Sequence, residues 1–179
     1  MTSFIYQKDD IGVKRLTISE LDGDYPYWFL DENVNKYNSH WSKPKTFQSI
    51  CKYVENLEAE SNQLVFAIYS IQDNKHIGNI SLQNIDHFNQ SAEIAFLFGN
   101  RDYWGKGYAY IASKLIINHG FVYLNLKRLY LGCLECNVAM CKLSLKLGFI
   151  KEGLRRGALF SGGEFKNVVE YGLLKDEFI

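Results

Sequence analysis

Hydrophobic residues along this chain alternate with polar ones in some segments and recur every three to four residues in others. Alternation is typical of strands with one buried face, and the longer period is typical of helices that pack on one side. The pattern predicts strands at 13–19, 63–71, 76–82, 91–98, 127–136, 149–160 and 165–174. Helices are predicted at about 22–30, 47–59, 108–124 and 137–147.

Capping and turn residues set the expected boundaries. Ser19 and Asp22 are candidate N-caps for the first, short helix, and Thr46 is a candidate for the second. Asn137 is expected to cap the last helix and Gly148 to end it. The polar segments 33–44, 72–75 and 84–90 are predicted to be a loop, a hairpin turn and a connection.

This order of elements predicts an α/β (α+β) fold in which helices cover a mixed, mostly antiparallel twisted sheet. We expect six to seven strands and about four helices. The chain has 179 residues and shows no internal repeat, low-complexity segment or linker. A single domain spanning 1–179 is therefore expected.

Composition narrows the function classes. The chain is 47% hydrophobic, and its 20 basic residues balance its 20 acidic ones. A neutral chain is not expected to bind nucleic acid generally, because that function favours an excess of basic residues. No apolar run approaches the ~20 residues needed to span a bilayer, and the first ten residues lack the apolar core of a signal peptide. We therefore expect a cytoplasmic protein without a membrane partner.

Four cysteines, at positions 51, 133, 136 and 141, raise the question of a metal or redox site. Cys133 and Cys136 form a C-x-x-C pair, which could be half of a zinc site or a redox pair. No second pair and no histidine cluster accompanies it, and Cys133 lies in a predicted strand. We expect reduced thiols in or near the core, and no metal.

A glycine-rich turn separates the predicted strand 91–98 from the predicted helix 108–124. Free backbone N–H groups and the helix dipole make such a turn a candidate phosphate site. The Walker motif does not fit, because Gly107 follows Gly105-Lys106 where a Ser or Thr is needed. The Rossmann motif does not fit either, because Tyr110 stands where a small residue is needed.

A third pattern fits. The acetyl-CoA motif of the GCN5-related N-acetyltransferase (GNAT) superfamily is Gln/Arg-x-x-Gly-x-Gly/Ala, and the turn resembles it, with Trp104 in place of Gln/Arg. The amino-acid sequence around the turn is similar to that of the branch containing the ribosomal-protein N-acetyltransferases. Three further features resemble the C-terminal part of the sequences in that branch. They are Asn137, the run Leu147-Gly148-Phe149-Ile150-Lys151-Glu152-Gly153 and the tail 163–174. The order of elements agrees from about residue 13 to the end.

The resemblance implies the acyl-CoA N-acyltransferase fold and direct transfer of an acetyl group from acetyl-CoA to a primary amine. The acceptor stays open between a small molecule, such as an amino sugar, and a protein N-terminus. The alternative is a non-catalytic domain that binds or senses acetyl-CoA. Homodimers are common in the branch. The resemblance also implies that the strand before the turn splays from its neighbour and binds the cofactor. The cofactor-binding residues it implies are Leu97, Phe98, Gly99, Trp104, Gly105, Lys106, Gly107, Tyr108, Ala109 and Asn137.

Two residues are candidates for proton transfer. Glu93 lies eleven residues before Trp104, where the histone-acetylating branch has its general base. Among Ile94, Phe96 and Phe98 we expect its carboxylate to be desolvated, which would raise its pKa. Ser144 lies four residues before Gly148, where relatives place the acid that protonates the CoA thiolate. The non-catalytic alternatives are a solvated glutamate at position 93 and a serine on a helix surface at position 144.

Weaker candidates surround these two. His87, beside Asp86, and Glu164, on the last hairpin, are candidates for contact with the acceptor. His76 begins a strand, and His119 on the long helix is expected to be structural. The aromatic residues of the first third, in the region that forms one wall of the acceptor site in this family, are expected mainly in the core. They are Trp28, Tyr37, Trp41 and Phe47.

Overall fold

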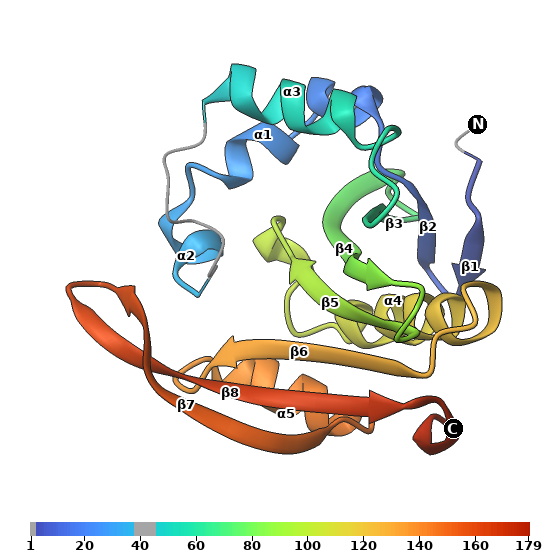
Figure 1. Cartoon of the computed structure of the whole chain (residues 1–179). Coiled ribbons are helices and arrows are strands. Elements are labelled where there is room, and N and C mark those ends of the chain that lie inside the picture. The colour runs from blue at the N-terminus through green and yellow to red at the C-terminus, as the bar shows by residue number, and fades with distance from the viewer. Residues whose placement is uncertain (1–2, 38–45) are drawn as a thin grey trace.

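The computed structural model describes residues 3–37 and 46–179, and it places eight strands of this part of the chain in one sheet (Figure 1). The strands are β1 (Tyr6–Lys8), β2 (Ile11–Arg15), β3 (Leu64–Ser70), β4 (Lys75–Asp86), β5 (Ser91–Leu97), β6 (Arg128–Leu134), β7 (Ile150–Ser161) and β8 (Glu164–Leu174). The α-helices are α1 (Tyr25–Trp28), α2 (Glu32–Asn35), α3 (Phe47–Asn56), α4 (Tyr108–Asn118) and α5 (Val138–Lys146).

The strands lie in the order β1-β2-β3-β4-β5-β6-β8-β7. Every neighbouring pair is antiparallel except β5 and β6, which are parallel. Parallel neighbours need a crossover connection, and α4 supplies it. The predicted mixed, mostly antiparallel sheet is confirmed.

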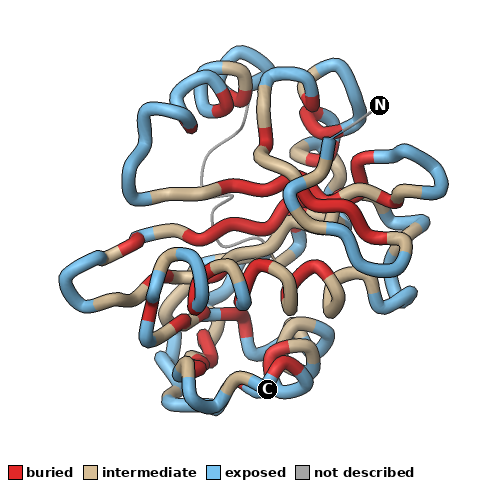
Figure 2. The backbone as a smooth tube through the Cα atoms, turned by 90° about the vertical axis from the view of Figure 1, so that its right-hand side faces the viewer, coloured by how far each residue is buried: buried red, intermediate tan, exposed pale blue. Residues whose placement is uncertain are grey.

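Each face of the sheet carries its own core, as alternate residues of β3 show. Phe66 and Ile68 join the cluster that contains α4, whereas Val65 and Ala67 join the cluster that contains residues of α1 and α3. Successive side chains of a strand point to opposite faces, so the two clusters lie on the two sides of the sheet. Figure 2 shows buried residues along the central strands and on parts of the helices.

The strand count was slightly low because β1 was missed. This edge strand has three residues, of which two are exposed, so no alternation is visible in it. The helix α2 overlaps the start of the predicted loop 33–44 and was also missed. It has four residues and is capped by Asp31, which accepts a hydrogen bond from the Asn33 amide, so it is too short to show a helical period.

Some boundaries and caps differ from the prediction. Thr17 precedes a 3-10 helix (Ile18–Asp22) and Asp24 precedes α1, so the caps proposed at Ser19 and Asp22 were wrong. Strand β4 continues to Asp86 through the predicted connection 84–90, because Asp86 pairs with Ser91 of β5. Helix α4 ends early and continues as a π-helix, His119–Tyr123.

Within the described ranges, no helix is both long enough and apolar enough to cross a bilayer.

Candidate active site

The two parallel strands separate in the middle of the sheet. Pairing between β5 and β6 ends at Glu93 and Tyr130, although β5 continues to Leu97 and β6 to Leu134. In Figure 1 the two ribbons diverge at this point. The splay expected from the resemblance is confirmed. It leaves backbone groups of β5 facing an opening instead of a neighbouring strand.

A small cavity of about 90 Å³ lies where these strands diverge. Its walls come from both strands, from the start of α5 and from the end of the first described segment. The residues that line it are Tyr37, Glu93, Ile94, Ala95, Phe96, Leu131, Gly132, Cys133, Asn137 and Met140. We call it the splay cavity.

The glycine turn leads from β5 into α4 through two glycines with positive φ angles. Gly105 and Gly107 have φ angles of 74° and 82°, a region that favours glycine. A Cβ atom at either position would meet nothing within 4 Å, so the space beside the turn is open. Gly107 is the N-cap of α4, and the first amides of that helix have no partner one turn earlier.

Side-chain hydrogen bonds tie the turn to the rest of the fold. The Tyr103 hydroxyl donates to Asp73 Oδ2 at 2.5 Å, and the Tyr108 hydroxyl donates to Asp10 Oδ2 at 2.9 Å. The indole Nε1 of Trp104 donates to the Phe98 carbonyl at 3.0 Å. Trp104 therefore connects the turn to the end of β5. The presence of Trp where the family motif has Gln or Arg did not predict this contact.

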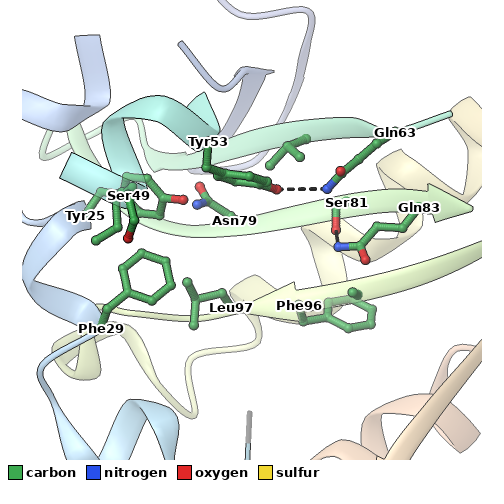
Figure 3. A pocket seen from close by; sticks show the side chains of 13 residues that line it. Tyr25, Phe29, Ser49, Tyr53, Gln63, Asn79, Ser81, Gln83, Phe96 and Leu97 are labelled. Carbon is green, nitrogen blue, oxygen red and sulfur yellow. Dashed lines mark hydrogen bonds between the residues drawn. The ribbon is translucent and has the colours of Figure 1, made fainter. Parts of the chain in front are cut away.

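A larger cavity of about 370 Å³ lies on the α1 and α3 side of the sheet (Figure 3). This volume is within the range of small-molecule sites, about 300–1,000 Å³. Its lining residues are Tyr25, Phe29, Ser49, Ile50, Tyr53, Gln63, Val65, Asn79, Ser81, Gln83, Ala95, Phe96 and Leu97. We call it the α3 cavity. It shares Ala95 and Phe96 with the splay cavity, so β5 is a common wall of the two.

A row of polar side chains from β4 lines the α3 cavity. Asn79, Ser81 and Gln83 alternate with buried Ile80 and Leu82, so the polar residues share one face of the strand. This row was not among the predicted site residues, although polar residues at every second position of a buried central strand indicate such a site.

Glu93 stands at the end of this row. It is the cross-strand partner of Gln83, and directly paired residues point to the same face. The expected apolar surroundings of its carboxylate were wrong in part. Ile94 and Phe96 pack in the cluster on the opposite face, because successive residues alternate. Glu93 is half-buried, and its Oε2 accepts a hydrogen bond from Asn84 Nδ2 at 3.0 Å.

The charge of Glu93 affects the residue beside it on β6. Burial raises the pKa of the Tyr130 hydroxyl, and the negative charge of Glu93 raises it further. Tyr130 is also the last β6 residue paired with β5. A neutral phenol therefore lies next to the carboxylate at the point where the strands separate.

The two candidates near α5 have well-defined partners. The Asn137 side chain accepts a hydrogen bond from the Met140 amide at 3.1 Å, which confirms the predicted N-cap, and Asn137 lines the splay cavity. Ser144 is fully buried, so the alternative of a serine on a helix surface is wrong. Its hydroxyl donates to the Met140 carbonyl at 2.9 Å, and it lines neither cavity.

The weaker acceptor candidates lie away from both cavities. His87 is exposed on the turn after β4, and Glu164 is exposed on the last hairpin, paired with Lys166 at 3.4 Å. Trp28 is buried in the core as expected, Tyr37 lines the splay cavity, and Phe47 is 59% exposed, contrary to expectation. Trp41 lies outside the described residues.

His76 has a supporting position behind the α3 cavity. Its Nε2 lies 2.8 Å from Asn79 Oδ1 and 3.0 Å from the Gly78 carbonyl, so this nitrogen carries the hydrogen and donates to both. Its Nδ1 is buried and lacks a hydrogen-bond partner among the described residues. Burial holds the pKa of His76 below its usual value. A neutral histidine thus orients the Asn79 amide so that its NH₂ group is free to donate elsewhere.

The cysteines do not pair as the C-x-x-C spacing allowed. Cys133 Sγ lies 3.6 Å from Cys141 Sγ, whereas Cys136 is exposed. All four are free thiols as expected, but Cys136 lies on the surface instead of in or near the core. Across residues 3–37 and 46–179, no group of three or more His, Cys, Asp or Glu side chains could hold a metal ion.

Comparison with known proteins relates this geometry to a family. The family model described as an acetyltransferase (GNAT) domain matches residues 13–150. The uncharacterized N-acetyltransferase p20 of Bacillus licheniformis is 30% identical over 170 residues, which cover 94% of each chain. The putative ribosomal N-acetyltransferase YdaF of Bacillus subtilis is 32% identical over 108 residues, 60% of this chain and 58% of that one.

Polyamine enzymes are also among the similar proteins. The spermidine N(1)-acetyltransferase of Escherichia coli K12 is 31% identical over 107 residues, 60% of this chain and 57% of that one. The crystal structure of the Vibrio cholerae spermidine N-acetyltransferase in complex with CoA and spermine superposes with a TM-score of 0.86 at 21% identity. It covers 94% of this chain and 97% of that chain, and at this identity it supports the fold alone. The chain belongs to the GNAT family and is an N-acetyltransferase.

Proposed function

We propose that the protein transfers the acetyl group of acetyl-CoA directly to a primary amine held in the α3 cavity. The observation that carries this proposal is the position of Glu93. It lies where β5 and β6 separate and lines the splay cavity, two residues before Ala95, which lines both cavities. Direct transfer requires both substrates to meet at one point, and β5 beside Glu93 is the wall that the two cavities share.

The donor would lie along the splay. The open turn Gly105-Lys106-Gly107 and the first amides of α4, those of Tyr108 and Ala109, suit the pyrophosphate of CoA. Backbone groups of Leu97, Phe98 and Gly99 would hold the pantetheine arm and the thioester carbonyl. Gly99 also needs its small size, because a Cβ there would lie 1.7 Å from the Trp28 ring. Asn137 would contact the cofactor from the start of α5.

The chemistry requires the amine to lose a proton and the tetrahedral oxyanion to receive hydrogen bonds. Glu93 is placed to accept the proton, and unpaired amides along β5 are placed to donate to the oxyanion. Ser144 would donate to the departing thiolate only after exchanging its bond to the Met140 carbonyl. We therefore assign it at most an accessory part in turnover.

The alternative function, acetyl-CoA binding or sensing without catalysis, is separated by two measurements on the purified protein. Release of free CoA in the presence of acetyl-CoA and a panel of amines supports transfer. A rise in melting temperature with CoA, without CoA release from any amine, favours the binding domain. The absence of any thermal shift with CoA or acetyl-CoA would contradict both.

A further inference from the structure

The α3 cavity is polar, yet none of the described residues that line it carries a charge. The seven polar side chains in its lining belong to Tyr25, Ser49, Tyr53, Gln63, Asn79, Ser81 and Gln83, all of which are neutral. Small-molecule sites usually place a few polar groups where the ligand needs them. The chemistry of this lining therefore indicates what kind of molecule holds the reacting amine.

Two carboxylates near the start of α1 are engaged in contacts outside the lining of the cavity. Glu20 is buried, and its oxygens accept hydrogen bonds from Thr17, Ser19 and Tyr69 and pair with Lys14 at 2.6 Å. Asp24, before α1, pairs with Lys75 at 3.0 Å. The segment 38–45, which the structure does not describe, contains no Asp or Glu in its sequence. Glu93 lines the splay cavity, and the charge of Glu60 adds to the burial that raises the pKa of the Tyr53 hydroxyl, but neither carboxylate is among the described lining residues of the α3 cavity.

The neutral groups keep donors available for a ligand. The Tyr53 hydroxyl accepts from Gln63 Nε2 at 2.8 Å, and the Ser81 hydroxyl accepts from Gln83 Nε2 at 2.8 Å (Figure 3). Each hydroxyl retains its own hydrogen. His76 occupies Asn79 Oδ1, which leaves the Asn79 NH₂ group to donate. Gln63 and Gln83 each use one amide hydrogen in these bonds and retain their carbonyl oxygens as acceptors.

Aromatic surfaces lie beside this polar row. Tyr25 and Phe29 contribute rings to the lining, and Leu97 adds an aliphatic surface. In Figure 3 the Phe29 ring lies beside Leu97 of β5, whereas Asn79, Ser81 and Gln83 come from β4. A ligand with hydroxyl groups on its edge and an apolar ring face would satisfy both surfaces.

We propose that the acceptor is a small polyhydroxylated amine of the amino-sugar class, bound through neutral hydrogen bonds in the α3 cavity. This inference rests on the proposed function and adds the substrate class to it. A polyamine would bring several positive charges into a cavity with no carboxylate among its described lining residues, and burying unpaired charge is costly. The acceptor of this chain thus differs from the polyamine named for the enzymes of Escherichia coli and Vibrio cholerae.

The test compares amines under one assay. The full-length protein is mixed with acetyl-CoA and with glucosamine, galactosamine, cyclohexylamine, spermidine, or a hexapeptide with a free N-terminus, and CoA release is measured. We expect kcat/KM for the best amino sugar to exceed the values for cyclohexylamine and spermidine by about tenfold or more, because the cavity groups would be unpaired without the hydroxyls. Spermidine or the peptide as the best substrate would overturn the inference while leaving the proposed function intact.

A second measurement covers a failure of turnover. If no amine releases CoA, the proposed function fails, and ligand-observed NMR in the presence of CoA then decides whether the cavity binds the sugar. Glucosamine signals that broaden with wild-type protein, and less with Ser81→Ala, would still support the neutral polar site. Equal broadening by spermidine and glucosamine would contradict it.

Two substitutions at one position sharpen the test. Ser81→Ala is expected to raise KM for the amino sugar several-fold and to leave KM for acetyl-CoA unchanged, since it removes one hydrogen bond to the acceptor. Ser81→Asp supplies a carboxylate and should shift the preference toward spermidine. Ser91→Ala is the matched control, because Ser91 lies in the same sheet and lines neither cavity. Equal effects of the two alanine variants on KM would overturn the assignment.

Discussion

Glu93 has two neighbours that define its environment, the Asn84 amide and the Tyr130 phenol. The carboxylate is close to solvent, to the polar row of β4 and to the separated strands. A role in proton transfer would therefore depend on where it lies relative to the substrates. Substitution can separate that role from binding.

Glu93→Gln keeps the shape and the hydrogen-bonding capacity of the side chain but cannot accept the amine proton. We expect kcat to fall by about 10²-fold or more, the usual contribution of a general base. Affinity for CoA, measured by isothermal titration, should change little. Glu164→Gln is the matched control, because Glu164 is exposed and lines neither cavity. An unchanged kcat and pH–rate profile in Glu93→Gln would exclude the role.

Ser144→Ala tests the second candidate for proton transfer. The hydroxyl is buried and bonded to its own helix, so its removal is expected to slow turnover only a few-fold, and CoA thiolate leaves without strong assistance. The measurement is kcat with a good acceptor, alongside the melting temperature. Loss of all turnover in a variant that melts like the wild type would show that the serine is essential.

Sequence information was sufficient for these residues to different degrees. The Asn137 cap and the Thr46 cap follow from local rules, and both are present. The two-residue period of a strand is enough to predict that Glu93 and Ile94 point to opposite faces of the sheet. Which of the two faces is buried depends on how α3 and α4 pack, and the period does not give that. The partners of His76 could not be predicted. Asn79 and the aromatic rings that surround His76 come together only in the folded sheet.

The glycine turn and helix α4 form one element, and its backbone conformation can be tested. Gly107→Asp places a carboxylate beside the pyrophosphate and a side chain at a φ of 82°. We expect loss of the thermal shift caused by CoA. Gly163→Asp is a close control, because Gly163 has a φ of 83° and equally open surroundings on the last hairpin. A CoA response in Gly107→Asp equal to that of Gly163→Asp would move the donor site elsewhere.

The elements that sequence predicted well are the long ones. Strands β3, β5, β7 and β8 and helix α5 have enough residues for a period to appear, and their ends agree within a few positions. The elements that were missed, β1 and α2, have three and four residues. They are held by sheet pairing or by a cap, so no pattern of their own identifies them.

At the scale of the whole molecule, buried His76 and half-buried His119 couple stability to pH. Burial lowers the pKa of His76 and of His119, and the charge of Arg15 lowers that of His119 further. The unfolded chain therefore binds protons first, near pH 6.5. Stability from these groups is complete above that value and falls as the pH decreases toward the folded-state pKa values. The carboxyl groups of Asp10 and Glu20 have lowered pKa values, so their contribution is lost only at more acidic pH.

Chemical denaturation at pH 7.5, 6.5 and 5.5 checks this expectation. The free energy of unfolding should fall from the first to the last, by at most about 1.4 kcal/mol per pH unit for each histidine. Replacement of buried His76 by Gln should reduce the slope, and replacement of exposed His87 by Gln should not. A flat profile in the wild type would contradict the burial argument.

The homodimer implied by the resemblance remains a prediction. Light scattering of the native protein tests it.

The early end of the β5–β6 pairing has a consequence for backbone exchange with solvent. Residues 94–97 belong to a central strand, yet they are paired on one side only, with β4. Amides that face the opening should exchange with deuterium much faster than those of β3 or β4, despite their central place in the fold. A bound donor that occupies the opening would slow that exchange, so deuterium uptake in this strand would report acetyl-CoA binding even in a variant that cannot turn over.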